Sequence, residues 1–256
     1  MATEAVPAGL PLTSRHRPVP RAQERVFFGG IAILLCAVVV FGFSRTYFAA
    51  GMVLAPLPNA LVHVHGGAFT LWMALYLVQS ALVSAKRVAW HRTLGTIAFC
   101  LPPIMVVLGV AAAMDSLRRG IRIGGLPSSV SLAIPLIGIA AFAVVIAAAW
   151  RARRRPDAHK RLIVIATIGL TEAAIGRFPV WMRMGVPPAG SNVLFLGLLL
   201  ILVVGYDLYA LRRVHRATMW AAPFTLILAA LAVPIGMTPM WHGFAGFLAE
   251  HVAPHF

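Results

Sequence analysis

The sequence predicts an all-α membrane protein, a polytopic bundle of about seven transmembrane helices. Of its 256 residues, 60% are hydrophobic and 11% are charged, whereas a soluble domain carries about a quarter charged residues. Seven apolar stretches are long enough to cross a hydrocarbon core about 30 Å thick, which needs roughly 20 helical residues. The charges form short runs between these stretches, where they can reach water.

The chain divides into three predicted regions. Residues 1–25 are polar, basic and proline-rich and should lie in the cytoplasm. Residues 26–237 form the membrane domain, and its first apolar run is too long for a cleaved signal peptide. Residues 238–256 form an outer tail, for which we expect a short helix lying in the membrane interface. The apolar residues that predict this helix are Trp241, Phe244, Phe247, Leu248 and Val252.

Six of the seven expected spans are nearly free of charged residues; the fifth is the exception. Prolines in the third, fourth and seventh spans should kink them, because proline removes a backbone hydrogen-bond donor. The fifth span is the least apolar, because it contains Glu172 and Arg177. The expected spans are 26–43, 60–83, 94–114, 129–150, 162–180, 191–210 and 218–237, and the prolines are Pro102, Pro103, Pro135, Pro223 and Pro234.

Lysine and arginine are distributed unequally between alternate connections. Sixteen fall on one side and six on the other, and the last forty residues contain neither. Because cytoplasmic loops are enriched in basic residues, the sequence predicts a cytoplasmic N-terminus and an outer C-terminus. The six are Arg45, Arg118, Arg119, Arg122, Arg177 and Arg183; the other basic residues make up the sixteen.

Composition also excludes several classes of function. The net charge of +15 is spread over short loops, so we attribute it to topology and expect no nucleic-acid partner. The only cysteines, Cys36 and Cys100, lie in apolar runs and predict no disulfide framework. A retinal protein needs a lysine within its last helix, but Lys86 and Lys160 lie in turns. No phosphate-binding glycine loop, zinc-protease helix or strained serine turn is found.

A histidine followed by a basic residue occurs near the expected start of the third, fifth and seventh spans. The pairs are His91-Arg92, His159-Lys160 and His215-Arg216, and they predict three repeated helical hairpins. The segments ALVHVHGG at 60–67, HRTLG at 91–95, AHKRL at 158–162 and RVHRAT at 213–218, with Gln79 and Asp207, resemble a widespread family of uncharacterised bacterial polytopic membrane proteins. That family usually has proline where this chain has Arg216. The resemblance implies a multi-pass protein of the bacterial inner membrane.

The second span carries a stripe of polar and aromatic side chains along one face. These are His65, Phe69, Trp72, Tyr76 and Gln79, spaced as on one side of a helix. The stripe could wall a haem or quinone pocket, with Gly66 and Gly67 allowing close approach. Alternatively, it is an aromatic packing face whose histidine bonds a neighbouring helix. His63 lies about 200° around the helix from His65, so the pair predicts no metal site.

His91, His159 and His215 lie near the cytoplasmic ends of three helices at similar depth. This arrangement loosely resembles the b-type haem membrane cytochromes, in which histidine pairs hold the iron. The resemblance implies that His65, Trp72, Tyr76 and these three histidines could contact haem b. The opposing argument is that the three lie in wet, basic turns.

Glu172 is the candidate for proton chemistry. It lies 11 residues beyond Arg161, which places it about 16 Å into the membrane, where carboxylates usually face a cavity or a partner. It could relay protons or gate a transport path, or it could be protonated and hydrogen-bonded. Arg177 is offset from it by about 140° and should extend outward. For Asp207 we expect a salt bridge with Arg212 or Arg213.

Arg92, Lys160 and Arg216 stand beside helix starts, where a basic residue is mildly unfavourable. Free backbone N–H groups beside guanidinium and imidazole donors suit an anion, so we expect these residues to bind anionic lipids of the inner leaflet. The alternative is a topology signal alone. For the whole protein the sequence leaves three functions open: a membrane redox protein with b-type haem or quinone, a proton-coupled small-molecule carrier, and a lipid-binding or assembly protein without chemistry.

Overall fold

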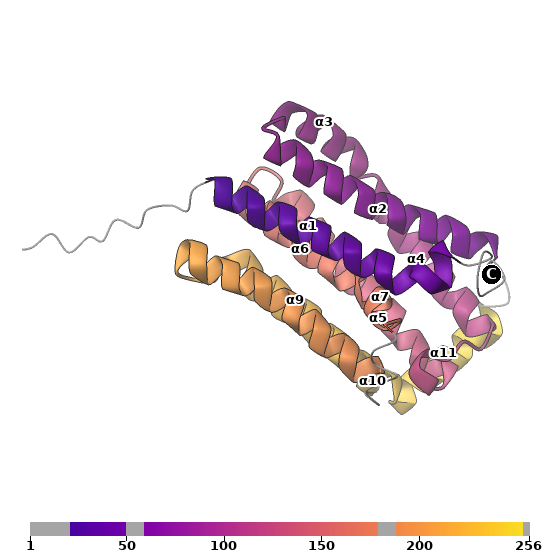
Figure 1. The fold of residues 1–256 in the computed structure, drawn as a ribbon. Helices are drawn as coiled ribbons and strands as arrows, with labels where there is room; N and C mark the ends of the chain where they lie inside the picture. Colours follow the sequence, from indigo (N-terminus) through magenta and orange to yellow (C-terminus); the bar gives the residue numbers. More distant parts are fainter. Residues whose placement is uncertain (1–20, 50–58, 179–187, 253–256) are drawn as a thin grey trace, which may run out of the picture.

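The computed structural model describes residues 21–49, 59–178 and 188–252, and every regular element in these ranges is helical (Figure 1). The helices are α1 (Arg21–Phe43) with the π-helical turn η1 (Ser44–Phe48), α2 (Ala60–Ser84), α3 (Val88–Ala98), α4 (Leu101–Arg118), the short 3-10 turn η2 (Ile123–Gly125), α5 (Ser128–Arg151), α6 (Pro156–Leu170), α7 (Glu172–Ile175), α9 (Pro188–Leu211), α10 (Arg216–Gly236) and α11 (Pro239–His251).

Six of the helical segments in the described residues are long and apolar enough to cross a membrane. This agrees with a multi-pass membrane protein. Their outward faces carry exposed large apolar side chains, such as Val40, Leu71, Val107, Leu198 and Ile227, and lipid is the solvent that suits such faces. The six are Arg21–Phe48, Ala60–Ser84, Val88–Arg118, Ser128–Arg151, Gly190–Leu211 and Arg216–Gly236.

The fifth predicted span, 162–180, is not among these six segments. It is covered by α6, which has 15 residues and starts before it at Pro156, and by the single turn of α7. The two are separated by a break at Thr171, whose hydroxyl donates to the carbonyl of Ile168 at 2.7 Å. Residues 179 and 180 lie outside the described part of the chain. The break interrupts the helical ladder directly before Glu172.

The predicted hairpins are present, with small shifts at their ends. α2 is followed by α3, α5 by α6, and α9 by α10, each pair joined by a short turn and packed together. Lys86 and Arg212 have positive φ angles of 61° and 56° directly after α2 and α9, the left-handed conformation that ends many helices. α3 and α6 each begin three residues before their histidine, whereas His215 is the N-cap of α10.

The prolines act differently in different helices. α3 stops at Ala98 and α4 starts at Leu101, so the third predicted span is broken just before Pro102 and Pro103. α5 continues through Pro135, and α10 continues through Pro223 and Pro234. Proline lacks a donor and is tolerated in a first turn, which explains the break before α4.

The core lies where α5, α6 and α10 meet, and α4, α1 and α9 pack around it. α1 runs beside α6 and α7 in the same direction. Two contacts show this: Glu24, near the start of α1, pairs with Lys160 near the start of α6, and Gly42, near the end of α1, lies against Ala174 of α7. α6 and α7 therefore extend over most of the length of α1. α1 begins at Arg21, so the last residues of the predicted segment 1–25 are helical.

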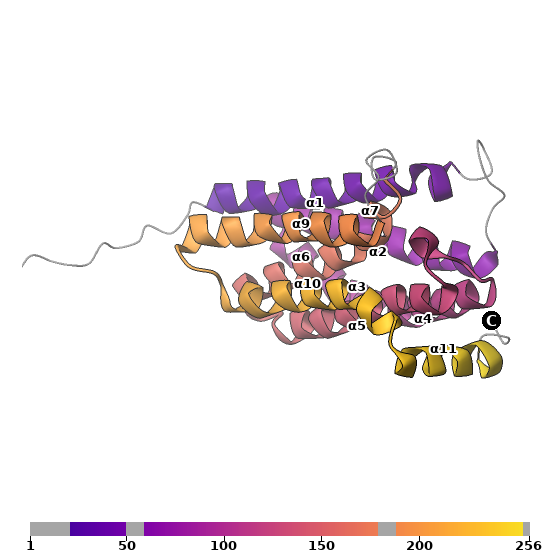
Figure 2. The same ribbon diagram turned by 90° about the horizontal axis from the view of Figure 1, so that it is seen from below.

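The C-terminal tail forms α11, as predicted, at the end of the bundle opposite the start of α1 (Figures 1 and 2). Trp241 donates its indole N–H to the carbonyl of Ser129 at 2.8 Å, and Ala245 is buried against α4 and α5. Phe244 and Phe247 are exposed, which is the arrangement of a helix with one face in the membrane interface. Residues 253–256 lie outside the described part of the chain.

Candidate functional site

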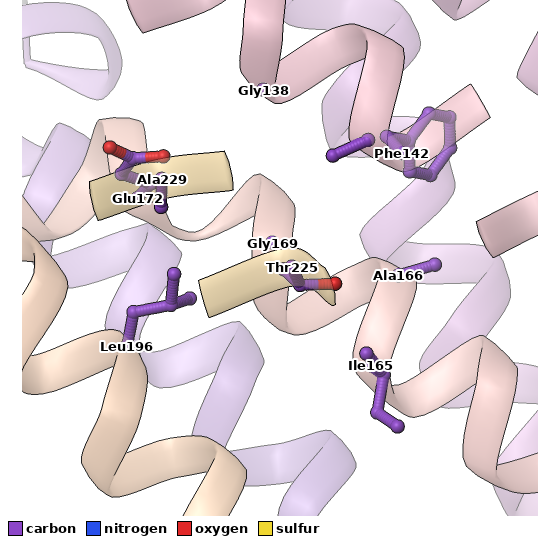
Figure 3. Close-up of a pocket in the computed structure, with 10 residues that line it drawn as sticks. Gly138, Phe142, Ile165, Ala166, Gly169, Glu172, Leu196, Thr225 and Ala229 are labelled. Atoms are coloured by element: carbon purple, nitrogen blue, oxygen red, sulfur yellow. The ribbon is translucent and has the colours of Figure 1, made fainter. Parts of the chain in front are cut away.

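Glu172 lines a cavity inside the bundle (Figure 3). The cavity has a volume of about 10 Å³, roughly the space that one water molecule needs. Its lining comes from α5, α6, α7, α9 and α10, including Phe142, Leu196 and Thr225. Gly138 and Gly169 also line it. A Cβ atom at Gly138 would be in ordinary contact with Glu172 Oε2 at 4.0 Å, whereas one at Gly169 would lie only 3.3 Å from Thr225 Cγ2.

No hydrogen bond or ion pair satisfies the Glu172 carboxyl group among the described residues. The nearby hydroxyl groups donate elsewhere: Thr225 donates to the carbonyl of Ala221 at 2.9 Å, and Thr171 to that of Ile168. Arg177 donates to the carbonyl of Ala173, and its guanidinium lies 4.5 Å from the ring centre of Phe43. Arg177 thus turns away from Glu172, and the carboxyl group is free to bind a proton or a cation.

The aromatic stripe of α2 is a packing face for several helices. Trp72 and Tyr76 are buried, and the Trp72 indole donates to Thr167 Oγ1 of α6 at 3.3 Å and meets the ring of Phe142 edge to face. The Gln79 amide, with its oxygen toward the backbone N–H of Gly95, joins α2 to α3. These contacts match the alternative in which the stripe packs.

Two polar atoms of the stripe have no hydrogen-bond partner in the described part of the chain. They are Nδ1 of His65 and the hydroxyl of Tyr76. His65 stacks on Phe69 with ring centres 4.3 Å apart. At Gly66 the approaching ring belongs to Tyr47, because a Cβ atom there would lie 2.6 Å from it, whereas Gly67 has open space. Close approach at Gly66 therefore serves a protein side chain.

The three histidines at the helix starts all make local hydrogen bonds. His91 Nδ1 accepts from the Gln79 amide, and His215 Nδ1 accepts from the backbone N–H of Ala217 at 3.0 Å. An accepting Nδ1 leaves the proton of a neutral ring on Nε2, so neither Nε2 has the lone pair that an iron needs. His159 is different, because its Nδ1 bonds the carbonyl of Ala149 at 2.9 Å, which leaves Nε2 free. Only one of the three thus has the tautomer of a haem ligand.

A metal cluster is also unsupported. Within the described residues, no group of three or more His, Cys, Asp or Glu side chains is placed to hold a metal ion. His63 instead accepts a hydrogen bond at its backbone carbonyl from the Tyr47 hydroxyl at 3.3 Å.

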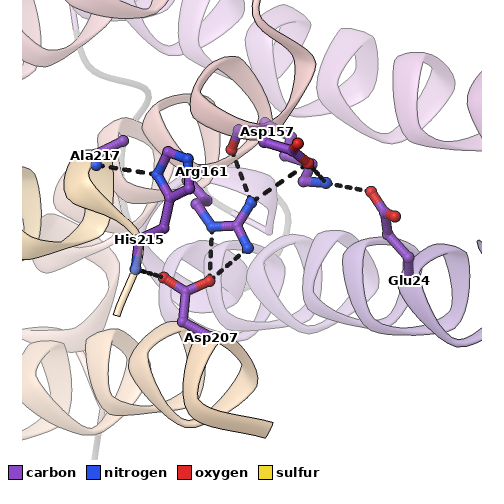
Figure 4. Close-up of polar contacts among 7 residues, drawn as sticks. Glu24, Asp157, Arg161, Asp207, His215 and Ala217 are labelled. Carbon is purple, nitrogen blue, oxygen red and sulfur yellow. Dashed lines mark hydrogen bonds and ion pairs between the residues drawn. The ribbon is translucent and has the colours of Figure 1, made fainter. Parts of the chain in front are cut away.

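Asp207 pairs with Arg161 rather than with Arg212 or Arg213, which corrects the expectation from the sequence (Figure 4). Both partners are buried. Arg161 Nε and Nη2 each lie 2.6 Å from Asp207 Oδ1, and Asp207 Oδ2 accepts from the backbone N–H of His215 at 3.0 Å. The network joins α6, α9 and α10 at the end of the bundle that carries most of the basic turns.

Lys160 lies in the same region, and its ammonium group is already paired with carboxylates. It bonds Asp157 at 2.6 Å and also pairs with Glu24 of α1. Two carboxylates neutralise its ammonium group, so the structure lends no support to the lipid role expected for Lys160. Arg92 and Arg216 are exposed, and the three repeated pairs therefore have different surroundings.

A second charged cluster, which the sequence reasoning missed, lies at the opposite end of the bundle. Asp115 is fully buried and pairs with Arg118 at 2.9 Å and Arg119 at 2.8 Å. It also accepts from the amide of Asn59 at 3.0 Å, the residue that caps α2 as predicted. Asp115 lies at the end of an apolar run, where a charged residue is expected. In the sequence, only its spacing to Arg118 and Arg119 could have indicated this cluster.

Comparison of the chain with protein-family models, with curated proteins and with solved structures finds no match. The class that the fold supports is a multi-pass helical membrane protein.

Proposed function

We propose that the protein is a proton-coupled carrier of a small molecule in the bacterial inner membrane. The observation that carries this proposal is the unpaired carboxyl group of Glu172, which stands at a break between two helices beside a water-sized cavity. Broken helices with an ionisable residue near the middle of the membrane are a recurring feature of transporter sites. An ionised carboxylate is costly there, so it needs either a proton or a cationic group of a substrate.

The carrier would have seven spans, with the N-terminus in the cytoplasm and the C-terminus outside. In addition to the six long segments, the fifth predicted span, made of α6 and α7, would also cross the membrane. Its support is the pairing with α1 from Glu24 to Gly42, together with the antiparallel pairing with α9, in which Arg161 meets Asp207 and Gly176 meets Asn192. The orientation rests on the excess of basic residues in one set of turns.

The test uses purified protein in proteoliposomes that contain a pH-sensitive dye. Solutes from a panel of organic acids, amines and sugars are added outside, and the pH inside is recorded. A coupled solute should change the internal pH with the wild-type protein, and Glu172→Gln should abolish this change while the solute still binds. Glu250→Gln on α11 is the matched control, because it removes an exposed carboxyl group.

Two outcomes would overturn the carrier. One is that no solute of the panel moves protons through the wild-type protein. The other is that Glu172→Gln transports protons as the wild type does. Thermal unfolding in detergent checks that the variant is folded in either case.

A membrane redox protein is the second candidate, and a specific observation favours it. His65 Nδ1 and the Tyr76 hydroxyl, both on the stripe of α2, lack a partner among the described residues. A tyrosine hydroxyl can donate to a carbonyl oxygen of a quinone, and an imidazole lone pair can accept from a hydroxyl of the reduced quinol. A visible spectrum of the purified protein would show a Soret band if haem b were bound, and chromatography of an organic extract would show a quinone. His65→Ala should remove either one; colourless, quinone-free protein excludes this candidate.

A further inference from the structure

A broad hollow, called here the basic groove, opens between the turn after α5 and the start of α10. It has a volume of about 890 Å³. Four arginines line it: Arg151, Arg155, Arg213 and Arg216. All four are exposed, and within the described residues none of their guanidinium groups pairs with a carboxylate. The groove therefore has a strongly positive rim.

The acidic residue that borders the groove does not cancel this charge. Asp157 bonds Lys160 at 2.6 Å and lies 3.9 Å from Arg161. These two cations also pair with Glu24 and Asp207, so the cluster keeps one net negative charge, against four positive charges on the groove arginines. The hydrogen bond from Lys160 lowers the pKa of Asp157 further below its ordinary value, which keeps these pairs in place. The four arginines remain available for an anion.

Apart from Asp157 and His215, the rest of the side chains that line the groove are apolar. Ala148, Leu162 and Ala217 contribute to its lining, together with the exposed side chains of Met219 and Trp220. Met219 and Trp220 lie about one helical turn beyond Arg216 along α10, toward the middle of the bundle. Charge at the end of the helices is thus followed by apolar surface one turn deeper, and tryptophan is typical of the membrane interface.

We propose that the basic groove binds an anionic phospholipid of the adjoining leaflet, with its phosphate among the four arginines and an acyl chain along Met219 and Trp220. Arginine suits this ligand because its planar fork bonds phosphate oxygens in pairs. The apolar wall distinguishes a lipid from a water-soluble anion, since a free phosphate would leave Met219 and Trp220 unused. Of the three repeated histidine-basic pairs, the site includes His215-Arg216 alone, and it does not depend on the function of Glu172.

The experiment measures lipid retention by the full-length protein in native mass spectrometry, with phosphatidylglycerol, cardiolipin and phosphatidylcholine added to delipidated protein. The groove variant carries Arg→Gln at positions 151, 155, 213 and 216. The control variant carries Arg→Gln at Arg21, Arg87, Arg92 and Arg154, which removes the same charge from the same end of the bundle but outside the groove. The groove variant should bind the two anionic lipids about tenfold more weakly or worse, and the control should bind them nearly as the wild type does.

Each remaining outcome contradicts the proposal. Equal losses in the two variants would mean diffuse charge attraction. Equal retention of phosphatidylcholine, which has a phosphate but no net charge, would mean that the net negative charge of the lipid is not recognised. Displacement of the lipid by inorganic phosphate at the same concentration would identify a site for a soluble anion. If the fourfold variant does not fold, the double variant Arg213→Gln with Arg216→Gln replaces it. Glu172→Gln should retain lipid normally, so that failure of the carrier function and failure of the groove can be told apart.

Discussion

His215 has a structural task that its residue type rarely performs. Its ring Nδ1 accepts from the backbone N–H of Ala217 and so caps α10, whereas Ser, Thr, Asp and Asn are the usual capping residues. Burial lowers the pKa of His215 below its ordinary value of 6.5, and the Arg161 guanidinium lowers it further, against the opposing effect of Asp207. A protonated Nδ1 cannot accept, so the cap exists only with the neutral ring.

We therefore predict that the cap contributes a pH-dependent part of the stability. A folded-state pKa below 6.5 means that the unfolded chain binds the proton more readily, so stability is lost as the pH falls from about 6.5 through the lower folded value. His215→Asn keeps an acceptor at the N-cap but does not titrate. Thermal unfolding in detergent between about pH 7.5 and pH 5 should show a flatter pH dependence for this variant.

His251→Asn is the matched control, because His251 is an exposed residue on α11. It should leave the pH dependence of the wild type unchanged. An equal slope for His215→Asn and the wild type would contradict the prediction. In that case the pH dependence would belong to other groups.

At the scale of elements, the contact between α1 and α7 depends on one glycine. A Cβ atom at Gly42 would lie 2.3 Å from the backbone carbonyl oxygen of Ala174, which is far closer than atoms can approach. Helices in membranes use small residues to bring their backbones together. The position of Glu172 therefore depends on Gly42, since this contact holds α7 beside the break in α6.

We predict that Gly42→Ala destabilises the protein by about 1–3 kcal/mol or more, because the backbone of α7 must move. Gly30→Ala is the control in the same helix, because nothing lies within 4 Å of a Cβ atom there and alanine favours a helix. Unfolding followed by circular dichroism in detergent measures both. Equal stability of the two variants would show that α1 and α7 do not pack this closely.

The ion pair between Arg161 and Asp207 joins three helices at one end of the core. Both side chains are buried, and removing one partner of a buried pair leaves a charge without compensation. Asp207→Leu should therefore cost about 3–5 kcal/mol. The double variant Arg161→Met with Asp207→Leu removes both charges and should recover most of that loss.

A double-mutant cycle by thermal unfolding checks this prediction. Arg153→Met is a control for the loss of an arginine, because Arg153 is exposed and lies over the ring of Trp150. If the double variant is as unstable as Asp207→Leu, the hydrogen bond from the His215 backbone to Asp207 is the stronger contribution, and the ion pair is not.

At the scale of the whole molecule, orientation is the prediction that remains to be measured. Reporter fusions after Arg155 and after Arg216 should report the cytoplasm, and a fusion at Phe256 should report the outside. The reason is the basic excess in the first set of turns. A cytoplasmic C-terminus would mean an even number of spans, and α6 with α7 would then be the segment that does not cross.

Sequence alone was sufficient for the helical class, the six long helices, the hairpin order, the cap at Asn59 and the C-terminal helix. The physical reason is that the bilayer imposes local demands along the chain: about 20 apolar residues for each span, charges at the ends, and caps or turns between them. These demands can be read without knowing which helices are neighbours. Glu172 could be identified in the same way, because a lone carboxyl group in an apolar run is conspicuous.

Only the tertiary structure decided which side chains meet. Asp207 pairs with Arg161 of another helix rather than with the nearer Arg212, Lys160 is taken by Asp157 and Glu24, and the basic groove collects arginines from two separate turns. Hydropathy and charge bias indicate which segments are able to cross a membrane, but not how each helix is rotated or which helix lies beside it. Those two quantities are set by packing between helices, where small residues such as Gly42 fix the distance of approach.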